Sequence, residues 1–468
     1  MVIGVVAFQA ADPQSERATL HTTRTGPVAA GVSGPVDALP RVLIDQLAGH
    51  DGRYVRIAGW VHRQRKLSRV TFLLVRDGWG VAQVVIEDDA VRASVRRLRP
   101  EDVVEVFGRV TQAAQAPGGF ELRGASIIVM APSAAMPPLD LGQPTLEGRL
   151  PTILDHAAFA LRHPGARATF RLSAASMAGF RGTLDAHRFT EICTPKIVSA
   201  ATETGANVFT VDYFGRPAFL AQSPQLYKQT MVGVFERVYE IGPVFRAEPH
   251  DTTRHLAEYV SMDVETAFVN DHWDLMALVR EVIAGMAERC RRAIERGLST
   301  PVDVPHVPDD IPVVSFNEAL ALIHSHTGGD EIDQPDLAPP DERWLGAWAR
   351  RERNSDFLFV EGYPMSCRPF YTHPDPKRPG ASRSFDLLFR GVELVTGGQR
   401  LHRHVDYLDA LGGRVPSGLE SYVDTFKCGM PPHGGFAIGL ERWIAGLTRS
   451  ANIRSATLFP RDNRRLTP

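Results

Sequence analysis

The sequence predicts an α+β protein with more than one domain, in which a small β-barrel precedes a larger domain built on a mainly antiparallel sheet with flanking helices. The chain has 468 residues, which is too long for one ordinary hydrophobic core. Short strand patterns crowd residues 41–132, whereas helix and strand patterns mix over residues 161–468. A stretch with four prolines, APSAAMPPLDLGQP, separates these two regions.

The composition is that of an ordinary globular protein, with 44% hydrophobic and 23% charged residues. The net charge of -2 lacks the overall basic character of many nucleic-acid-binding proteins, so a site for a polyanion must be a local patch. The sequence contains no run of 18 apolar residues, and we expect no membrane span.

The four cysteines lie far apart and form no CxxC pair; they are Cys193, Cys290, Cys367 and Cys428. This spacing argues against a zinc site or a disulfide framework. It suits a reducing compartment, and we expect a cytoplasmic protein.

Residues 1–40 are rich in Ala, Thr, Gly and Pro without periodicity, so we expect a disordered extension. The apolar start MVIGVVAFQAA has no basic segment before it. This favours a disordered tail, or a start codon further upstream, over a signal peptide.

Five strand patterns and one helix pattern predict the fold of residues 41–132. The strand patterns are YVRIAGWVH, VTFLLVRD, VAQVVIED, DVVEVFGRV and FELRGASIIVM, and AVRASVRRLRP fits a helix between the third and fourth. Five strands and one helix suit an OB-fold barrel, and a generic small barrel is the alternative.

Charge in this barrel is uneven. Residues 41–76 hold eight Lys or Arg and two acids. A basic strand face with Trp60 and Phe72 nearby suits single-stranded nucleic acid, because bases stack on rings and phosphates meet cations. The alternative is a solvated basic face above core aromatics.

We expect residues 133–160 to be a linker or hinge and residues 161–468 to form the second domain. ATFRLSAASMAGFRGTLDAHRF and DLMALVREVIAGMAERCRRAIERG have the apolar spacing of helices. The strand patterns VYEIGPVF and YVSMDVETAFV are joined by a hairpin, which favours an antiparallel sheet. Neither a Rossmann nor a P-loop nucleotide motif is present.

The hairpin between those strands carries RAEPHDTTRH. Arg246 follows the first strand, and Arg254 and His255 return at the base of the second. Guanidinium groups from the two sides of a hairpin can clamp a triphosphate, because each offers permanently charged, bidentate donors. An exposed loop with ordinary ion pairs is the alternative.

The strand after the hairpin is expected to have one apolar and one acidic face. Side chains alternate along a strand, which separates Val260, Met262, Val264 and Phe268 from Tyr259, Ser261, Asp263 and Glu265. Buried carboxylates require a cation beside them. A ligand amine, Mg²⁺ or a lysine would supply that charge.

Two later segments add carboxylates and a further arginine. Asp386 and Glu393 stand in RSFDLLFRGVELVTGGQRLHR, followed by Thr396 and Arg400. Such hard oxygens suit Mg²⁺ shared with phosphate oxygens. GGFAIGLERWIAGL reads as a strand entering a helix with Arg442 in the first turn, where backbone amides favour anions.

In this order, the motifs resemble those of the class II aminoacyl-tRNA synthetases, and within class IIb the archaeal-type aspartyl-tRNA synthetases. RFTEICTPKIV resembles motif 1, FRAE with the following RH resembles motif 2, and GLER resembles motif 3. FLAQSPQLYKQ, TTRHL, FDLLFRGVELVTGGQR, KCGMPPHGGF and LFPRDNRRLTP also resemble that group. The resemblance runs from about Arg41 to Pro468.

The resemblance implies a class II catalytic domain behind an OB-fold anticodon-binding domain. Its reaction joins L-aspartate to ATP as aspartyl-adenylate, releases pyrophosphate, and transfers the aspartyl group to the 3′-hydroxyl of tRNA. Alignment and charge neutralisation carry such a reaction, without a nucleophilic side chain.

The resemblance also assigns the nucleotide and metal sites. Arg246 corresponds to the arginine on the α-phosphate, Glu248 to the acid on the adenine amino group, and Arg442 to the arginine beside the γ-phosphate. The implied ATP-binding set is Arg246, Glu248, Arg254, His255, Leu256, Glu393, Gly439, Leu440, Glu441 and Arg442, with Arg246, Arg442 and Glu393 as catalytic residues. The implied Mg²⁺ ligands are Glu393, Asp386 and Thr396, the last standing where the group often has serine.

For aspartate, the resemblance pairs Lys228 and Arg400 around the side-chain carboxylate. Two cations favour aspartate over asparagine, which would leave the positive pocket uncompensated. The implied aspartate-binding set is Glu203, Gln225, Lys228, Arg246, Asp263, Thr396 and Arg400. Pro249 replaces a frequent acid of the motif 2 loop, which weakens the expectation of contacts with the tRNA acceptor there.

The barrel is expected to select the tRNA. The resemblance implies that Phe72 stacks on the central anticodon base and that Gln83 reads its edge. Discriminating members carry Trp and Lys where this chain has His62 and Pro117, so we expect the non-discriminating type, which charges tRNA-Asp and tRNA-Asn. An enzyme for tRNA-Asp alone, in which both residues are neutral changes, is the alternative. We also expect a homodimer through the Pro195 region, and no binding of DNA or membranes.

Three other functions are less consistent with the sequence. A paralogue with a non-tRNA acceptor is disfavoured because the chain keeps the barrel. An asparaginyl enzyme is disfavoured by Arg400 in GGQRLHR, and a non-catalytic RNA-binding or regulatory module by the suitable residues at every matched catalytic position.

Overall fold

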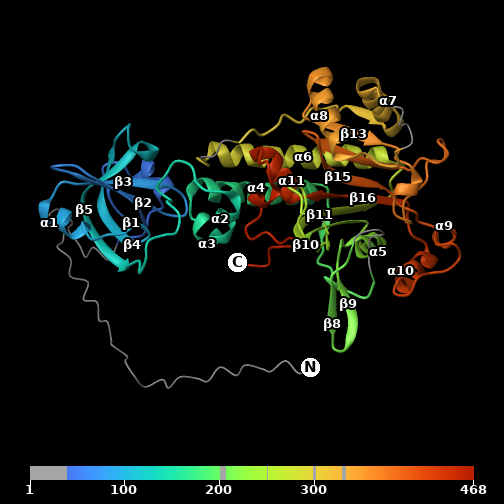
Figure 1. The fold of residues 1–468 in the computed structure, drawn as a ribbon, viewed down its shortest axis with the longest axis horizontal. Coiled ribbons are helices and arrows are strands. Elements are labelled where there is room, and N and C mark those ends of the chain that lie inside the picture. The colour runs from blue at the N-terminus through green and yellow to red at the C-terminus, as the bar shows by residue number, and fades with distance from the viewer. Residues whose placement is uncertain (1–38, 201–206, 250, 299–301, 329–333) are drawn as a thin grey trace. The chain divides into compact units, whose positions relative to one another are not determined.

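The computed structural model describes residues 39–200, 207–249, 251–298, 302–328 and 334–468 (Figure 1). The predicted disordered extension lies outside the described residues, except for its last two positions. The described chain divides into two compact units between Pro137 and Pro138. None of its helices is long and apolar enough to cross a membrane.

The first unit is a closed five-stranded barrel with the strand order β1-β2-β3-β5-β4. Its elements are the 3-10 helix Ile44–His50, β1 (Tyr54–Lys66), β2 (Thr71–Arg76), β3 (Val81–Ile86), α1 (Asp89–Val95), β4 (Val103–Gln112) and β5 (Phe120–Ala131). Alternating apolar residues such as Ile57, Leu73 and Val84 fill the barrel and are fully buried. The predicted five strands and the helix between the third and fourth are confirmed, although β1 is longer than its pattern indicated.

Two short helices stand within the predicted linker 133–160. They are α2 (Leu150–Asp155) and α3 (Ala157–Ala160). Their apolar side chains belong to a small cluster with Leu139 and Leu141. The proline-rich half of this segment is irregular, as its prolines indicated, but the second half is helical.

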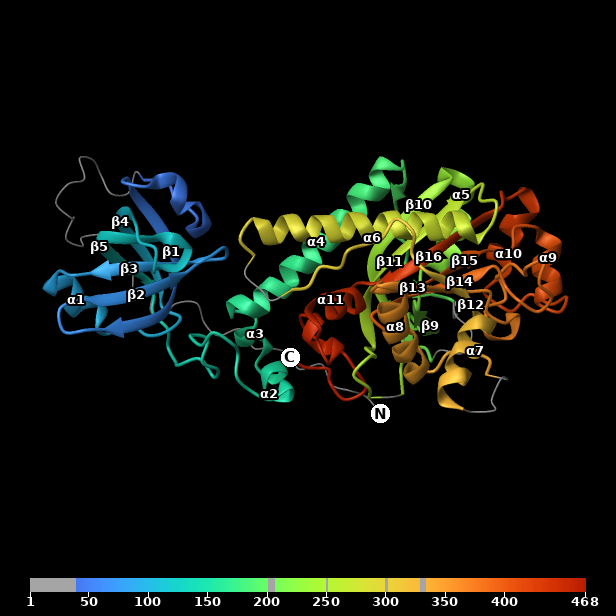
Figure 2. The same ribbon diagram turned by 90° about the horizontal axis from the view of Figure 1, so that it is seen from above.

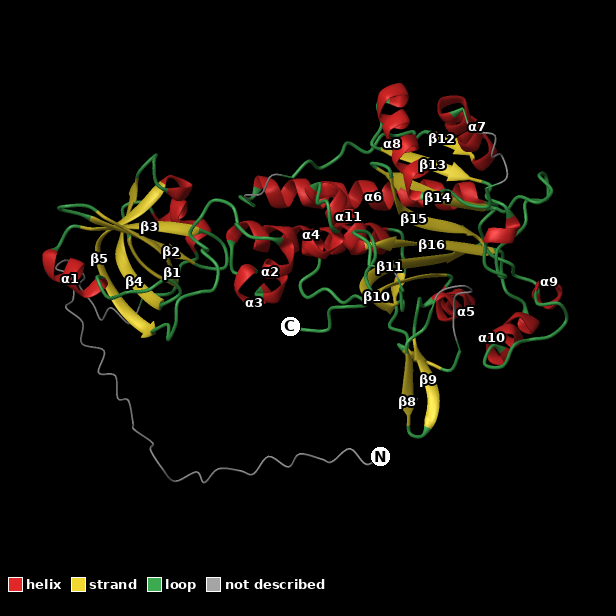
Figure 3. Cartoon of the chain, viewed as in Figure 1, coloured by secondary structure: helices red, strands yellow, loops and turns green. Residues whose placement is uncertain are grey.

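The second unit is built on an eight-stranded sheet of order β12-β13-β14-β15-β16-β11-β10-β6 (Figure 3). All neighbours are antiparallel except the two edge pairs, β12 with β13 and β10 with β6. The predicted mainly antiparallel sheet is therefore confirmed. The strands are β6 (Thr190–Glu191), β10 (Arg237–Phe245), β11 (Glu258–Ala267), β12 (Val313–Ser315), β13 (Phe357–Glu361), β14 (Ser384–Phe389), β15 (Val392–Gln399) and β16 (His433–Gly439).

A small three-stranded sheet and further helices surround it. The small sheet has the order β7-β9-β8, with β7 (Ile197–Val198), β8 (Thr210–Tyr213) and β9 (Arg216–Leu220). The helices are α4 (Pro164–Ala186), α5 (Gln225–Phe235), α6 (His272–Glu295), α7 (Phe316–Thr327), α8 (Pro339–Arg353), α9 (His404–Ala410), α10 (Glu420–Thr425) and α11 (Leu440–Thr448).

Helices α4 and α6 pack against each other, and with α11 they cover one face of the large sheet (Figure 2). Met262 and Val264 of β11 and Ile438 of β16 are buried on this face. The alternate residues of β11, Ser261 and Asp263, therefore point to the opposite face. That opposite face carries the cleft described below.

The alternation fails at one predicted position. Phe268 was expected on the apolar face of β11, but the strand ends at Ala267. Phe268 has a positive φ of 58° and is 68% exposed. Such a φ takes a residue out of the extended conformation, so the two-residue period does not continue past Ala267.

Candidate active site

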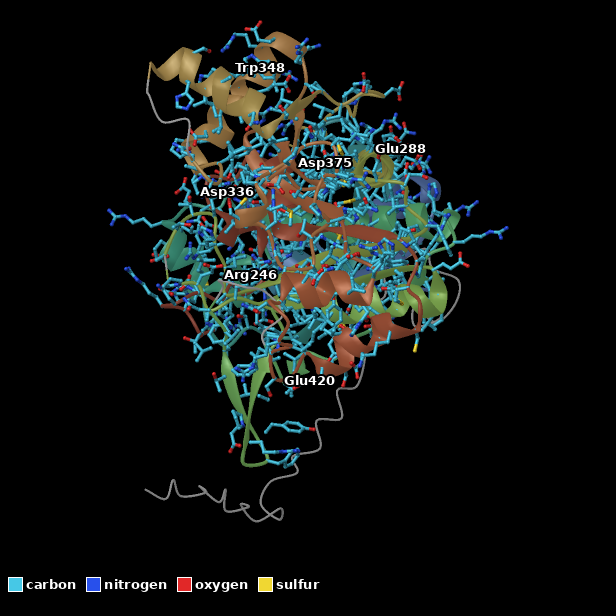
Figure 4. The ribbon with its side chains drawn as sticks, turned by 90° about the vertical axis from the view of Figure 1, so that its right-hand side faces the viewer. Arg246, Glu288, Asp336, Trp348, Asp375 and Glu420 are labelled. Atoms are coloured by element: carbon cyan, nitrogen blue, oxygen red, sulfur yellow. The ribbon has the colours of Figure 1, made fainter. Side chains whose placement is uncertain are left out.

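A cleft of about 300 Å³ lies on the polar face of the large sheet. It brings together most of the residues predicted for the catalytic domain, from five different segments. Those that line it are Gln225, Lys228, Arg246, Glu248, Arg254, His255, Leu256, Asp263, Glu393, Thr396, Arg400, Gly439, Glu441 and Arg442. Arg246, which lines the cleft, is labelled among the side chains drawn in Figure 4.

Three predicted residues do not line the cleft. Glu203 lies outside the described residues. Leu440 is buried among the apolar side chains of the core, because the first turn of α11 directs it away from the cleft. Asp386 is buried beneath the cleft, where it contacts Arg368.

The charged hairpin loop is held at its base and by the C-terminal segment. The Arg246 amide donates to the Ala257 carbonyl at 2.9 Å, and the Ala257 amide donates to the Arg461 carbonyl at 2.8 Å. Buried Arg454 reaches the Asp251 carboxylate at 2.7 Å. These contacts anchor the described part of the loop at its base and at Asp251.

A β-bulge explains how Glu393 and Thr396 reach the same side of the sheet. Leu387 pairs with Val395 and the next residue, Leu388, pairs with Glu393, so Leu394 is the extra residue of β15. A bulge shifts the alternation of side chains. The Thr396 hydroxyl donates to Glu393 Oε1 at 3.1 Å across this bulge.

Two carboxylates with different surroundings meet at this point. Burial works to raise the pKa of Glu393, but the Arg442 guanidinium and the Thr396 hydroxyl outweigh it, and the pKa is lowered. Burial raises the pKa of Asp386, and the Glu393 carboxylate adds to that rise against the opposing effect of Arg368. Within the described residues, Asp386 Oδ1 is buried and accepts no hydrogen bond.

The two cations predicted for the aspartate side chain are both buried and both already paired. Lys228 Nζ lies 3.0 Å from Asp263 Oδ1 and 3.4 Å from Glu265 Oε2. Arg400 Nε lies 3.1 Å from Glu265 Oε1. Glu265 is fully buried, and although burial works to raise its pKa, Arg400 and Lys228 lower it.

A network of neutral polar groups supports Gln225 from behind. Gln225 donates to Gln229 at 2.9 Å, and Gln229 in turn donates to Tyr407 Oη and to His433 Nε2, each at 3.1 Å. The Tyr422 hydroxyl donates to Gln229 Oε1 at 3.0 Å. The Gln225 side chain is therefore held in one orientation at the cleft wall.

Glu441 lines the cleft at the start of α11 and is also buried. Its two carboxylate oxygens accept the Val260 amide at 3.1 and 3.2 Å. Burial raises the pKa of Glu441 to about 7, against the effect of its backbone hydrogen bonds.

The residues predicted to read tRNA lie on the barrel of the first unit. Phe72 of β2 and Gln83 of β3 are half-buried on neighbouring strands, where Phe72 pairs with Val85 and Leu74 with Gln83. Gln83 donates to Glu121 at 2.8 Å. His62 lies at an irregularity of β1, and Pro117 is exposed in the turn before β5.

Several cleft residues were not predicted from the sequence. They include Gln222, Ser223, Arg368, Tyr371 and Thr372. Gln222 and Ser223 stand in the FLAQSPQLYKQ segment, whose resemblance to the family could have indicated that they line the site. Arg368 follows a short 3-10 turn outside any strand or helix pattern, and no local signal marks it.

No group of three or more His, Cys, Asp or Glu side chains with metal-binding geometry occurs among the described residues. Pro195, predicted at a dimer interface, is exposed between β6 and β7.

Comparison with known proteins matches each of the two units to a protein family. Residues 150–463 match the family described as tRNA synthetases class II (D, K and N), and residues 55–130 match the OB-fold nucleic acid binding domain. An aspartate–tRNA(Asp/Asn) ligase of Thermus thermophilus is 44% identical over 92% of this chain and 100% of its own length. An aspartate–tRNA(Asp) ligase of Thermoplasma acidophilum is 37% identical over the same shares of the two chains.

A solved structure is also similar. Asparaginyl-tRNA synthetase from Pyrococcus horikoshii, complexed with asparaginyl-adenylate, has a TM-score of 0.81 and 30% identity. The match covers 92% of this chain and 100% of that one.

Proposed function

The chain belongs to the class II tRNA synthetases of the D, K and N group, and from this premise we propose that it attaches L-aspartate to tRNA at the expense of ATP, on both tRNA-Asp and tRNA-Asn. One observation carries the proposal: a single cleft joins arginines of the hairpin and α11 to carboxylates of β11 and β15. This is the charge pattern that a triphosphate and an amino acid require together.

The first step forms an acid anhydride. An α-carboxylate oxygen of aspartate attacks the α-phosphorus of ATP, the bond to the bridging oxygen breaks, and pyrophosphate leaves. Arg246 and Arg442 neutralise the charge that develops on the phosphates, and Arg254 holds the terminal phosphate. In the second step the 3′-hydroxyl of tRNA attacks the activated carbonyl and gives its proton to the leaving phosphate or to water, while the bond between the carbonyl carbon and the phosphate oxygen breaks and AMP leaves.

Amino-acid selection rests on Lys228 and Arg400. Their partners Asp263 and Glu265 are buried with them, so the pocket is charge-balanced before any ligand binds. Adding the aspartate α-ammonium beside Asp263 shifts Lys228 and Arg400 towards the ligand carboxylate. Asparagine brings the same α-ammonium group but has a neutral amide in place of the side-chain carboxylate. The pocket would then carry one uncompensated positive charge.

The donor set beside these residues fits Mg²⁺. Glu393 and Asp386 offer carboxylate oxygens and Thr396 a hydroxyl, and Asp386 Oδ1 is a buried acceptor without a hydrogen bond in the described residues, which an ion would satisfy. When bound there, the ion would neutralise charge on the triphosphate.

The barrel supports recognition of tRNA. Phe72 and Gln83 lie on adjoining strands, where a ring can stack on a base and an amide can read its edge. His62 and Pro117 motivate the wider tRNA scope, as does the Asp/Asn name of the Thermus thermophilus relative. We further propose a cytoplasmic homodimer that uses the exposed Pro195 region.

The test is aminoacylation of tRNA-Asp and tRNA-Asn transcripts with labelled aspartate or asparagine. We expect both transcripts to accept aspartate and neither to accept asparagine. The variant His62→Trp/Pro117→Lys is expected to keep tRNA-Asp charging and to reduce tRNA-Asn charging. If tRNA-Asp is charged but aspartylation of tRNA-Asn is undetectable, the wider tRNA scope is refuted. If neither transcript is aspartylated, the proposed ligase activity itself is refuted.

A further inference from the structure

Helix α8 brings a carboxylate into the cleft region from a segment that no predicted motif includes. Glu342 lies in the first turn of α8 and its side chain is 10% exposed. Its Oε2 atom accepts from Arg254 Nη2 and, at 3.0 Å, from the backbone amide of Glu393. One oxygen thus joins the hairpin loop to the start of β15.

Two glycines allow this approach. A Cβ atom on Gly346 of α8 would lie 2.3 Å from the Gly391 amide, and one on Gly391 would lie 2.8 Å from the Arg343 Cα. Gly391 also has a positive φ of 75°. The helix therefore contacts the β14–β15 turn backbone to backbone, at a distance that larger residues prevent.

Arg254 uses only part of its guanidinium in this contact. Nη2 is engaged with Glu342, whereas Nη1 is buried and donates to no acceptor in the described part of the chain. A buried donor without a partner is costly, and a ligand oxygen would satisfy it. Arg254 lines the cleft, where a bound molecule can bring such an oxygen.

Resting on the proposed function, we propose that Glu342 is a positioning residue for ATP: it holds Arg254 by Nη2 so that Nη1 faces the terminal phosphates. A guanidinium presents its donors in a rigid fork, so one edge can be held while another binds. Glu342 therefore does not compete with ATP for Arg254. It removes the rotational freedom that binding would otherwise have to restrict.

The same carboxylate also fixes the backbone of Glu393. The Glu393 carbonyl and Oε1 both accept from Arg442 Nη1. One continuous set of contacts therefore crosses the proposed triphosphate end of the cleft, through Arg254, Glu342, Glu393 and Arg442. Burial raises the pKa of Glu342, while Arg254 and the Glu393 amide act in the opposite direction.

The experiment compares Glu342→Gln with Glu352→Gln in aspartate-dependent ATP–pyrophosphate exchange. The Glu342→Gln substitution keeps the shape of the side chain but removes its charge, whereas Glu352 is an exposed residue of the same helix whose side chain pairs with Arg351. We expect Glu342→Gln to raise KM for ATP about tenfold, with KM for aspartate within about twofold of the wild type. Glu352→Gln should change neither.

A double variant separates positioning from a purely structural role. If Glu342 acts through Arg254, Arg254→Ala/Glu342→Gln should have the same KM for ATP as Arg254→Ala alone. If the double variant raises KM for ATP by the product of the two single effects, the proposal is overturned. A Glu342→Gln variant with the same KM for ATP as Glu352→Gln would also overturn it. Calorimetric titration with ATP alone gives a readout besides activity and should show the same weakening.

Two further measurements cover the cases in which Glu342→Gln does not fold or the wild type shows no exchange. If Glu342→Gln does not fold, Glu342→Asp replaces it, because its carboxylate is one methylene short of Arg254 and should also raise only KM for ATP. A wild-type protein that binds ATP but lacks exchange would refute the proposed function and leave the calorimetric comparison to judge Glu342.

Discussion

The Nη1 atom of Arg442 donates both to the Glu393 carbonyl, at 2.7 Å, and to Glu393 Oε1, at 2.9 Å. This double contact joins the first turn of α11 to β15 at the end of the cleft where we propose that the triphosphate binds. It keeps a cation and a carboxylate in fixed positions, where a phosphate needs the first and a metal ion needs the second.

Arg442→Ala should lower the rate of ATP–pyrophosphate exchange by about 100-fold or more, because the variant loses a preorganised cation at the phosphates. Steady-state exchange measures this loss. Arg449→Ala is the matched control: Arg449 lies just after the same helix and its exposed side chain pairs with Asp303. Equal activity of Arg442→Ala and Arg449→Ala would contradict the role of Arg442.

Arg400→Gln should raise KM for aspartate by about 100-fold and narrow the preference for aspartate over asparagine. The variant leaves buried Glu265 with Lys228 as its cationic partner, so the melting temperature should also fall. Exchange with each amino acid and thermal unfolding measure both effects. Arg403→Gln, at an exposed arginine paired with Asp406, serves as the control. A preserved KM for aspartate would argue against this pocket.

Stability should fall as the pH drops from about 6.5 towards 4, in part because of His433. Burial lowers the pKa of His433 to about 4, which outweighs nearby Glu265, while Arg400 and His402 act in the same direction as burial. The unfolded chain therefore binds more protons than the folded chain across this window, because the fold keeps His433 in the neutral form that accepts from Gln229. The contribution is on the order of 3 kcal/mol.

Urea unfolding at several pH values checks this contribution. His433→Asn should flatten the pH dependence between about 4 and 6.5 relative to the wild type. His306→Asn is a suitable control, since His306 is an exposed histidine outside this network. An identical pH dependence for the wild type and His433→Asn would show that His433 does not contribute.

Phe72→Ala should reduce kcat/KM for tRNA about 10-fold to 100-fold while leaving ATP–pyrophosphate exchange intact, because base stacking contributes about 1–3 kcal/mol. Charging and exchange assays on the same preparation separate the two effects. Met130→Ala, at an exposed apolar residue near the end of β5, controls for the loss of apolar surface. A parallel loss of exchange would mean that the variant damages the fold instead of tRNA binding.

Regular alternation made much of the site predictable. Ser261 and Asp263 were expected on the polar face of β11, and the structure places both in the cleft. The position of Arg442 in the first turn of α11 likewise followed from the passage of a glycine-rich strand into a helix. These features depend on local sequence, which the periodicity of strands and helices reports directly.

Features that depend on distant contacts were not predictable. The bulge at Leu394, which puts Glu393 and Thr396 on one side, has no sequence signature beyond a nearby glycine. The pairing of Arg400 with Glu265 and the approach of Glu342 to Arg254 join residues 135 and 88 positions apart. No periodic pattern encodes such pairs, because tertiary packing alone determines them.

The most direct test of the central claim is ATP–pyrophosphate exchange by the wild type and Arg246→Ala, measured with each of the amino acids in turn. Exchange that depends on aspartate and is lost in Arg246→Ala is the predicted result. Exchange with no amino acid, or with asparagine in place of aspartate, would contradict the account.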